Sequence, residues 1–192
     1  MHTTPYARLA AFYFAYFAFI GAFSPYFGLY LQSLGHSAAA IGVLLAAMQV
    51  MRLVAPTLWA GMADRSGRHA PLLRLALALV CVVAAALCFV SGFWPLLALM
   101  ALLGFFTNAA LPLFESLTFA HLSDDIGRYG RLRVWGSAGF IATVSGAGAA
   151  LDIWPISLLP WLLLAALAVS FACAMAVPEV AAAREPPAPA AV

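Results

Sequence analysis

The sequence has very little charge. Only 8% of its 192 residues are charged and 66% are hydrophobic, with a mean hydropathy of +1.01. An ordinary soluble domain carries about 25% charged residues. So few charges cannot cover a surface that faces water on every side. The composition therefore excludes a soluble globular protein and indicates an integral membrane protein.

Lysine is absent, and all nine basic residues are arginine. The net charge of +2 provides no basic surface for a nucleic acid or another polyanion. The three cysteines, Cys81, Cys88 and Cys173, lie in apolar runs, and an odd number cannot form a closed set of disulfides. We interpret them as small apolar fillers. No residue pattern indicates a metal ion or a cofactor.

Period-two alternation of apolar and polar residues is also lacking, which excludes a transmembrane β-barrel. A spanning helix needs about 20 mostly apolar residues. The sequence predicts an all-α membrane fold with six such helices, over residues 9–33, 38–62, 71–90, 94–120, 130–151 and 156–177. The first is too long for the apolar region of a signal peptide, so we expect an uncleaved span. Residues 1–177 should form one bundle, and the Pro/Ala-rich residues 178–192 a disordered cytoplasmic linker.

Three of the predicted interhelical loops contain no arginine. The arginines outside the spans gather in the N-terminal segment, the second-to-third loop, the fourth-to-fifth loop and the tail: Arg8, Arg65, Arg68, Arg128, Arg131 and Arg184. Basic residues favour the cytoplasmic side of a membrane. We therefore expect both termini on the cytoplasmic side of a cell's inner membrane.

A faint internal repeat relates the first and fourth spans. Pro25-Tyr26-Phe27 and Pro112-Leu113-Phe114 lie at comparable places in the two helices. Because three is an odd number of spans, two three-helix units in one chain have opposite topology. The repeat predicts two inverted three-helix repeats.

One arginine lies far from both ends of its span. Arg52 is near the middle of the second predicted helix, where insertion scales put its cost at about 2.5–3.5 kcal/mol. Such a residue faces the bundle interior or a watery cavity and has a partner. It either binds a substrate carboxylate or forms a structural ion pair, for which Glu115 is the candidate.

Glu115 and Arg133 lie at similar distances from the loop that joins the fourth and fifth spans. Each alone is typical of a side chain that reaches water at a helix end. Their matched depth on neighbouring helices makes them a candidate ion pair. Asn108, Gln49 and Gln32 are further polar groups that either line a cavity or form hydrogen bonds between helices.

Aromatic residues surround the first span on all sides, so most face lipid or other helices, while Tyr16 and Phe19 could reach a pore. Small residues in the fifth span allow close helix packing. They are Gly136, Gly139, Gly146 and Gly148.

The stretch Ala63-Asp64-Arg65-Ser66-Gly67-Arg68 resembles the loop signature of the major facilitator superfamily, G-x-x-x-D-R-x-G-R-K. Ala60 stands in place of the leading glycine and His69 in place of the last basic residue. The resemblance implies the N-terminal half of a transporter, which needs a second six-helix half as its partner. It also implies a conformational gating loop made of Asp64, Arg65, Gly67 and Arg68.

A second motif resembles the lactose permease branch of that superfamily. Pro-x-x-Glu ends at Glu115, and Tyr-Gly-Arg-x-Arg-x-Trp-Gly-x-x-Gly begins at Tyr129. In that branch the glutamate, the second arginine and a later aromatic bind the sugar. These roles fall on Glu115, Arg133 and Phe140, although the permease has tryptophan at the last position.

The surroundings of Arg52 resemble the related phenylpropionate permease group, whose substrates are aromatic acids. The fifth span lacks the Gly-Pro pair that marks antiporters, which favours symport. The resemblance thus implies proton-coupled symport of a small organic solute, either an aromatic acid or a sugar-like molecule. The expected binding residues are Glu115, Arg133, Phe140, Arg52 and Asn108.

Two other classes of protein are compatible with six spans. An intramembrane hydrolase could use Ser137 as a nucleophile, but it needs a histidine base on a facing helix, and every histidine lies in a loop or at a helix end. A non-transporting scaffold, such as the product of a truncated gene, is the other alternative.

Overall fold

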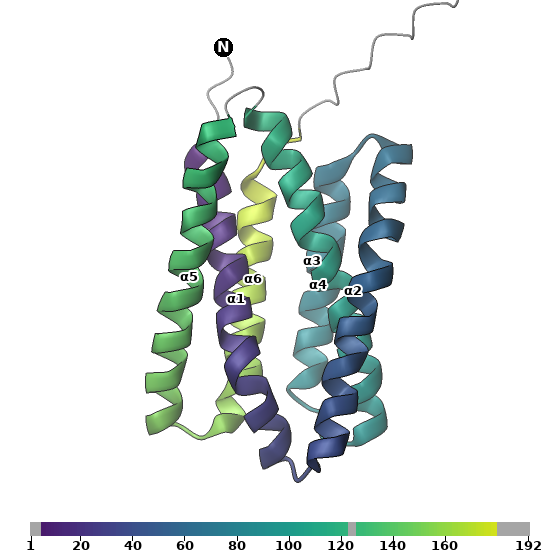
Figure 1. Cartoon of the computed structure of the whole chain (residues 1–192), viewed down its shortest axis with the longest axis vertical. Helices are drawn as coiled ribbons and strands as arrows, with labels where there is room; N and C mark the ends of the chain where they lie inside the picture. The colour runs from purple at the N-terminus through teal and green to yellow at the C-terminus, as the bar shows by residue number, and fades with distance from the viewer. Residues whose placement is uncertain (1–4, 123–125, 180–192) are drawn as a thin grey trace, which may run out of the picture.

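The structure, a computed structural model, describes residues 5–122 and 126–179. Each of the six helices in the described part is long and apolar enough to cross a membrane, which confirms the six predicted spans (Figure 1). A short 3-10 turn, η1 (Ile156–Leu158), precedes the last one. The helices are α1 (Tyr6–Ser33), α2 (Ala38–Ser66), α3 (His69–Leu87), α4 (Phe93–Leu122), α5 (Ile126–Ile153) and α6 (Leu159–Ala176).

Local sequence determines where these helices begin and end. The Ser37 hydroxyl accepts a hydrogen bond from the Ala40 amide at 3.3 Å, which caps α2. Several helices extend past the predicted spans; α2 reaches Ser66, and α5 begins at Ile126. Hydropathy finds only the part of a helix that lies in lipid, whereas the backbone continues helically into the polar boundary.

The helices pack in two groups of three. α1 packs mainly against α5 and α6, α4 packs mainly against α2 and α3, and α3 and α6 join the groups. Exchanging the first three helices with the last three reproduces this pattern. Pro25 and Pro112 lie equally far from the first residues of α1 and α4. The structure thus has the two inverted three-helix repeats that the sequence predicts.

Glycine permits the closest helix contacts in both groups. A Cβ on Gly21 would lie 2.6 Å from the Phe140 carbonyl oxygen, and one on Gly104 would lie 2.6 Å from that of Met48. A Cβ on Gly139 would overlap the Phe14 carbonyl. The packing role predicted for the α5 glycines is confirmed at Gly139, but Gly146 has open space around it and takes no part.

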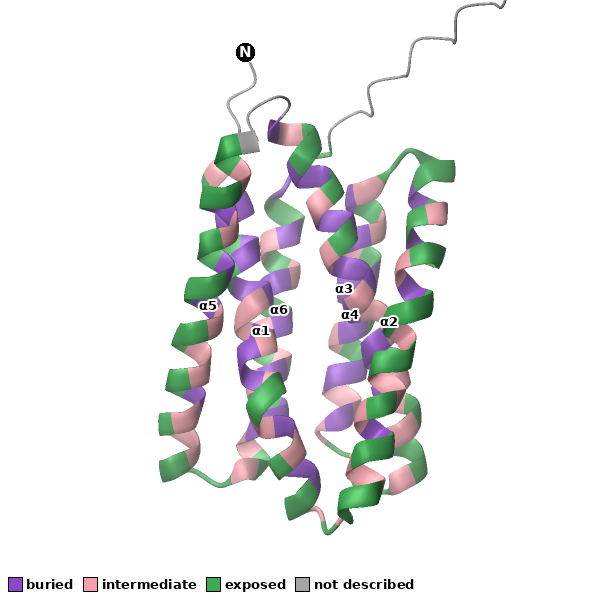
Figure 2. Cartoon of the chain, viewed as in Figure 1, coloured by how far each residue is buried: buried purple, intermediate pink, exposed green. Residues whose placement is uncertain are grey.

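Burial is unequal among the helices. Half of the most apolar window of α1 is buried, against only 11% for α2 and 17% for α5. Figure 2 shows exposed residues running along the outer sides of α2 and α5. These two helices therefore present most of their surface to something outside the six-helix bundle.

Two arginines hold the end of α6. The Arg74 guanidinium donates to the carbonyls of Ala174 and Val177, the latter at 2.9 Å, and Arg8 donates to the carbonyl of Ala176 at 3.1 Å. Cations at a helix C-terminus satisfy its free carbonyls and complement its dipole. Of the linker predicted over 178–192, residues 180–192 lie outside the described residues.

Substitution of Gly104 by alanine should destabilise the bundle. The new methyl group would meet the α2 backbone, and overpacking of this kind costs about 1–3 kcal/mol. Gly146→Ala is the matched control, because its Cβ meets nothing and alanine favours a helix over glycine. The measurement is the thermal unfolding midpoint of each purified variant in detergent. Equal midpoints for the two variants would contradict the close contact between α2 and α4.

Candidate functional site

Glu115 on α4 and Arg133 on α5 keep the matched positions expected from the sequence. Glu115 lies as many residues before the end of α4 as Arg133 lies after the start of α5. However, α4 and α5 touch only sparsely, and no ion pair joins these two residues in the part of the chain that the structure describes. The candidate ion pair is therefore absent from this conformation.

Glu115 has a different partner. The Tyr129 hydroxyl donates a hydrogen bond to Glu115 Oε1 at 3.1 Å. The Tyr129 ring stacks on Phe119, with 4.7 Å between ring centroids. Tyr129 precedes Arg133 by one helical turn, so α5 presents both side chains on one face. Tyr129 is the first residue of the second sequence motif, but the motif did not assign it a role.

Arg133 lies against aromatic rings of α1. Its guanidinium carbon is 4.4 Å from the centre of the Phe17 ring and 5.7 Å from that of Tyr13. Cation–π contacts of this kind stabilise a partly desolvated arginine. Arg133 Nη1 is buried and has no hydrogen-bond partner. A buried donor without an acceptor costs about 1–3 kcal/mol, and more when it is charged, so Nη1 is an unused hydrogen-bond donor in this structure.

A second polar atom without a partner lies nearby. The Tyr13 hydroxyl is buried and makes no hydrogen bond, although its ring packs edge-on against Phe114 at 5.1 Å. Of the two α1 residues expected at a pore, Tyr16 instead donates to the Thr107 carbonyl at 2.7 Å, and Phe19 is buried in the core. That expectation is wrong because aromatic residues surround α1 completely, and a periodic pattern cannot distinguish a pore-facing ring from a core ring.

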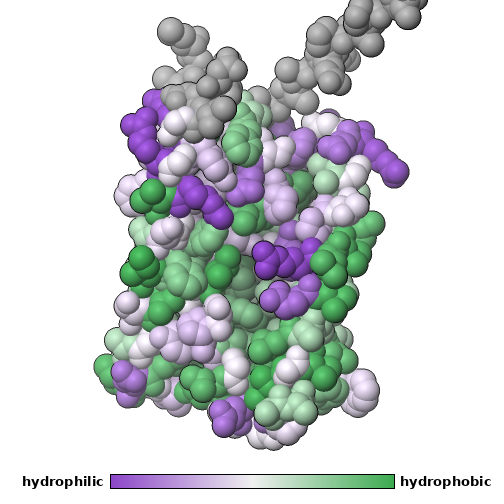
Figure 3. Space-filling model, in the orientation of Figure 1, coloured by the Kyte–Doolittle hydropathy of each residue, from purple (hydrophilic) through white to green (hydrophobic). Residues whose placement is uncertain are grey.

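Arg52 is exposed on α2, together with Gln49. A hydrophilic patch interrupts the apolar surface at mid-height, where α2 and α4 lie (Figure 3). Arg52, Glu115 and Arg133 are carried by three different helices, α2, α4 and α5.

Asn108 and Phe140 are both half-buried. The Asn108 amide donates to the Gly104 carbonyl of its own helix at 2.8 Å, which leaves its carbonyl oxygen for another donor. The backbone of Phe140 lies against Gly21 at the α1–α5 contact. No ring stacking or cation–π contact involves Phe140 within 5–122 and 126–179, so its position is fixed by backbone packing.

Most of the loop expected between residues 62 and 71 is helical, because α2 continues to Ser66 and α3 begins at His69. Asp64 and Arg65 are exposed in the last turn of α2, and only Gly67 and Arg68 separate α2 from α3. Gly67 has φ +62°, a left-handed conformation that glycine adopts without steric cost, and so ends the helix. A cavity of about 100 Å³ between α2 and α4 is lined by residues that include Asp64, His69 and Ser116.

The described residues include no group of three or more His, Cys, Asp or Glu side chains that could hold a metal ion. What the geometry offers is a set of separated charges in an apolar bundle, with free hydrogen-bonding capacity on Arg133, Tyr13 and Asn108. Such a set can bind a small polar or anionic molecule.

Comparison with known proteins identifies the family of the chain. Residues 6–186 match the model of the family described as "MFS_1 like family". The maltose permease of Geobacillus stearothermophilus is 33% identical over 71% of this chain and 35% of its own length. A probable 3-phenylpropionic acid transporter of Escherichia coli K12 is 30% identical over 69% of this chain and 35% of its own length.

The fold also matches a solved structure. The nucleoside transporter NupG (D323A mutant) superposes with a TM-score of 0.84 at 16% sequence identity, over 91% of this chain and 44% of that one. The chain therefore covers less than half of each of these proteins.

The family places the chain among transporters and not among enzymes, which rules out the intramembrane hydrolase. The chain is a multi-pass membrane protein of the MFS_1 like family, with the six-helix fold of one half of a major facilitator transporter.

Proposed function

We propose that the chain forms half of a secondary transporter that moves a small organic solute by alternating access. The observation that carries the proposal is the state of Arg133. Its guanidinium rests on Phe17, its Nη1 has no acceptor, and the nearby carboxylate of Glu115 is bonded to Tyr129 instead. Charges kept apart in an apolar bundle are expensive, and a ligand that accepts from Arg133 would recover that cost.

The charges favour an organic anion as the substrate. The proposed site contains two positive charges, on Arg52 and Arg133, and one negative charge, on Glu115. A substrate carboxylate would neutralise the remaining positive charge. A guanidinium binds a carboxylate in a two-pronged arrangement, and aromatic rings such as Phe17 suit an aromatic body. One relative is named as a probable transporter of 3-phenylpropionic acid, which has both features. The similarity to a maltose permease supports a sugar as the alternative substrate. Its hydroxyl groups would donate hydrogen bonds to the Glu115 carboxylate.

Transport requires a second six-helix half. We infer that it covers the exposed faces of α2 and α5 and completes the site around Arg52, Glu115, Arg133, Asn108 and Phe140. Both termini would face the cytoplasm of a cell whose inner membrane holds the protein. Asp64, Arg65, Gly67 and Arg68 would then lie on the cytoplasmic side and act in gating, and symport would couple the solute to protons.

Arg133→Ala should weaken the binding of 3-phenylpropionate by roughly tenfold or more, because a charge-assisted hydrogen bond is lost. Arg131→Ala is the matched control, since Arg131 is an exposed arginine on the same helix. The measurement is equilibrium binding of the labelled acid to the protein in nanodiscs. Equal losses in the two variants, or no loss in Arg133→Ala, would contradict the proposed role.

Tyr129→Phe should weaken substrate binding by about fivefold, because Glu115 loses the hydrogen bond that orients it. Tyr26→Phe removes a comparable bond, from the Tyr26 hydroxyl to the Val144 carbonyl at 2.8 Å, at a place outside the proposed site. It should leave binding unchanged in the same assay. A control variant that binds as weakly as Tyr129→Phe would show that the effect is only structural.

Arg52→Gln should separate the two substrate classes. If the substrate is an anion, the variant loses affinity for 3-phenylpropionate while any binding of maltose is unaffected. Competition assays with the two ligands measure both affinities. A variant that binds 3-phenylpropionate as well as the unsubstituted protein would exclude Arg52 from the anion site.

A further inference from the structure

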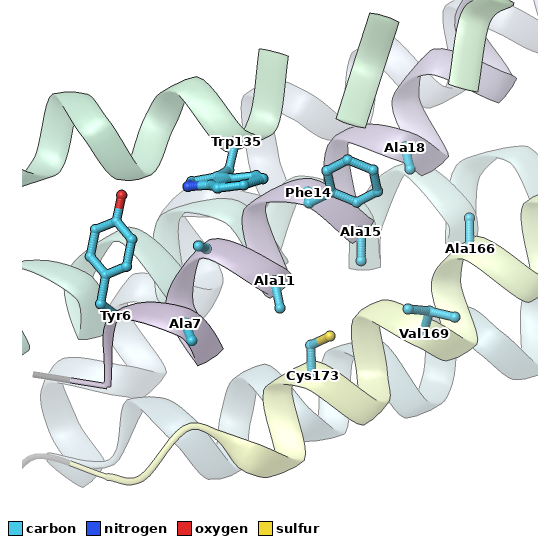
Figure 4. A pocket seen from close by; sticks show the side chains of 11 residues that line it. Tyr6, Ala7, Ala11, Phe14, Ala15, Ala18, Trp135, Ala166, Val169 and Cys173 are labelled. Carbon is cyan, nitrogen blue, oxygen red and sulfur yellow. The ribbon is translucent and has the colours of Figure 1, made fainter. Parts of the chain in front are cut away.

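An open apolar groove of about 660 Å³ runs along α1, between α5 and α6. Alanines of α1, among them Ala11 and Ala15, form its floor, while Trp135 of α5 and Val169 and Cys173 of α6 form its walls (Figure 4). α5 and α6 make few contacts with each other, so Ala7, Ala11 and Phe14 of α1 are left exposed between them.

The groove faces away from the proposed substrate site. At 3.6 residues per turn, Trp135 projects roughly 160° around α5 from Arg133. On α1, the groove residues Ala11 and Ala15 lie about 120° or more around the helix from Tyr13 and Phe17, which contact Arg133. A ligand in the groove would therefore be distinct from the transported solute.

Positive charge flanks one end of the groove. Arg131 is exposed and lies one helical turn before Trp135 on the same face of α5. Arg8, exposed on α1 beside the groove residue Ala7, reaches across to the Ala176 carbonyl at the end of α6. Tyr6 lines the groove at the same end, and rings such as Tyr and Trp favour the depth of lipid headgroups.

We propose that the groove binds a phospholipid with an anionic headgroup. One acyl chain lies along the α1 alanines between α5 and α6, where the surface of the groove is almost wholly apolar. The headgroup phosphate lies beside Arg131 and Arg8 in the leaflet at the end of the bundle where α1 begins. Apolar contact supplies the fit along the groove, and the arginines select the negative charge.

The test is native mass spectrometry of the purified chain, titrated with phosphatidylglycerol and, separately, with phosphatidylcholine. The unsubstituted chain should retain one phosphatidylglycerol more tightly than phosphatidylcholine. Ala11→Trp fills the groove and should weaken that binding by roughly tenfold or more. Ala46→Trp, at an exposed alanine of α2 outside the groove, should leave it unchanged.

The headgroup contact needs its own variants. Arg131→Gln should weaken phosphatidylglycerol binding by about fivefold, the usual effect of one arginine near an anionic lipid surface, and leave phosphatidylcholine binding unchanged. Arg65→Gln removes an exposed arginine from α2 and controls for the general effect of positive charge. Equal losses in these two variants, or equal retention of the two lipids, would overturn the assignment of the headgroup.

Photo-crosslinking keeps the proposal testable if Ala11→Trp does not fold. Phosphatidylglycerol with a diazirine on its acyl chain should label the unsubstituted chain at the groove segments of α1 and at the segment around Cys173. Labelling of α2 as strong as that of the groove segments would contradict a specific lipid site. So would the loss of a dimer, rather than of lipid, in Ala11→Trp, because a second copy of the chain would then occupy the groove.

Discussion

The cost of an unpaired polar group in hydrocarbon constrains this molecule more than any other factor. Most polar side chains within the spans avoid this cost by forming hydrogen bonds inside the bundle. The hydroxyls of Thr107, Thr118 and Ser170 return to carbonyls of their own helices, and Tyr16 reaches the Thr107 carbonyl of α4. Among the described residues, the buried side-chain atoms without a partner are Trp59 Nε1 on α2 and, at the candidate site, Arg133 Nη1 and the Tyr13 hydroxyl. The Arg133 guanidinium carbon lies 5.7 Å from the centre of the Tyr13 ring.

The inverted repeats explain how such charges are kept apart. The first helix of each repeat, α1 or α4, packs against the second helix of the other repeat, and α4 and α5 hardly touch. Glu115 and Arg133 have separate partners, Tyr129 and Phe17. Close glycine contacts, such as Gly139 against Phe14, fix α5 on α1 and with it the place of Arg133.

Hydropathy and small motifs predict the fold well because length and apolarity alone decide whether a helix spans a membrane. The same information predicts the depth of Glu115 and Arg133, since depth follows from residue count along a helix. It cannot predict partners across helices. Tyr129 and Phe17 were missed because their roles depend on how α5 is rotated against α1 and α4, and Phe19 was misjudged for the same reason. Gly146 shows that glycine content alone does not identify a contact.

We propose that Glu115 and Arg133 are held apart for a ligand and do not form a structural ion pair. A double-mutant cycle with Glu115→Gln, Arg133→Gln and the double variant, followed by the free energy of unfolding without substrate, tests it most directly. The account predicts effects that add within about 0.5 kcal/mol. A coupling energy of about 2 kcal/mol or more would reveal a structural salt bridge and contradict the account.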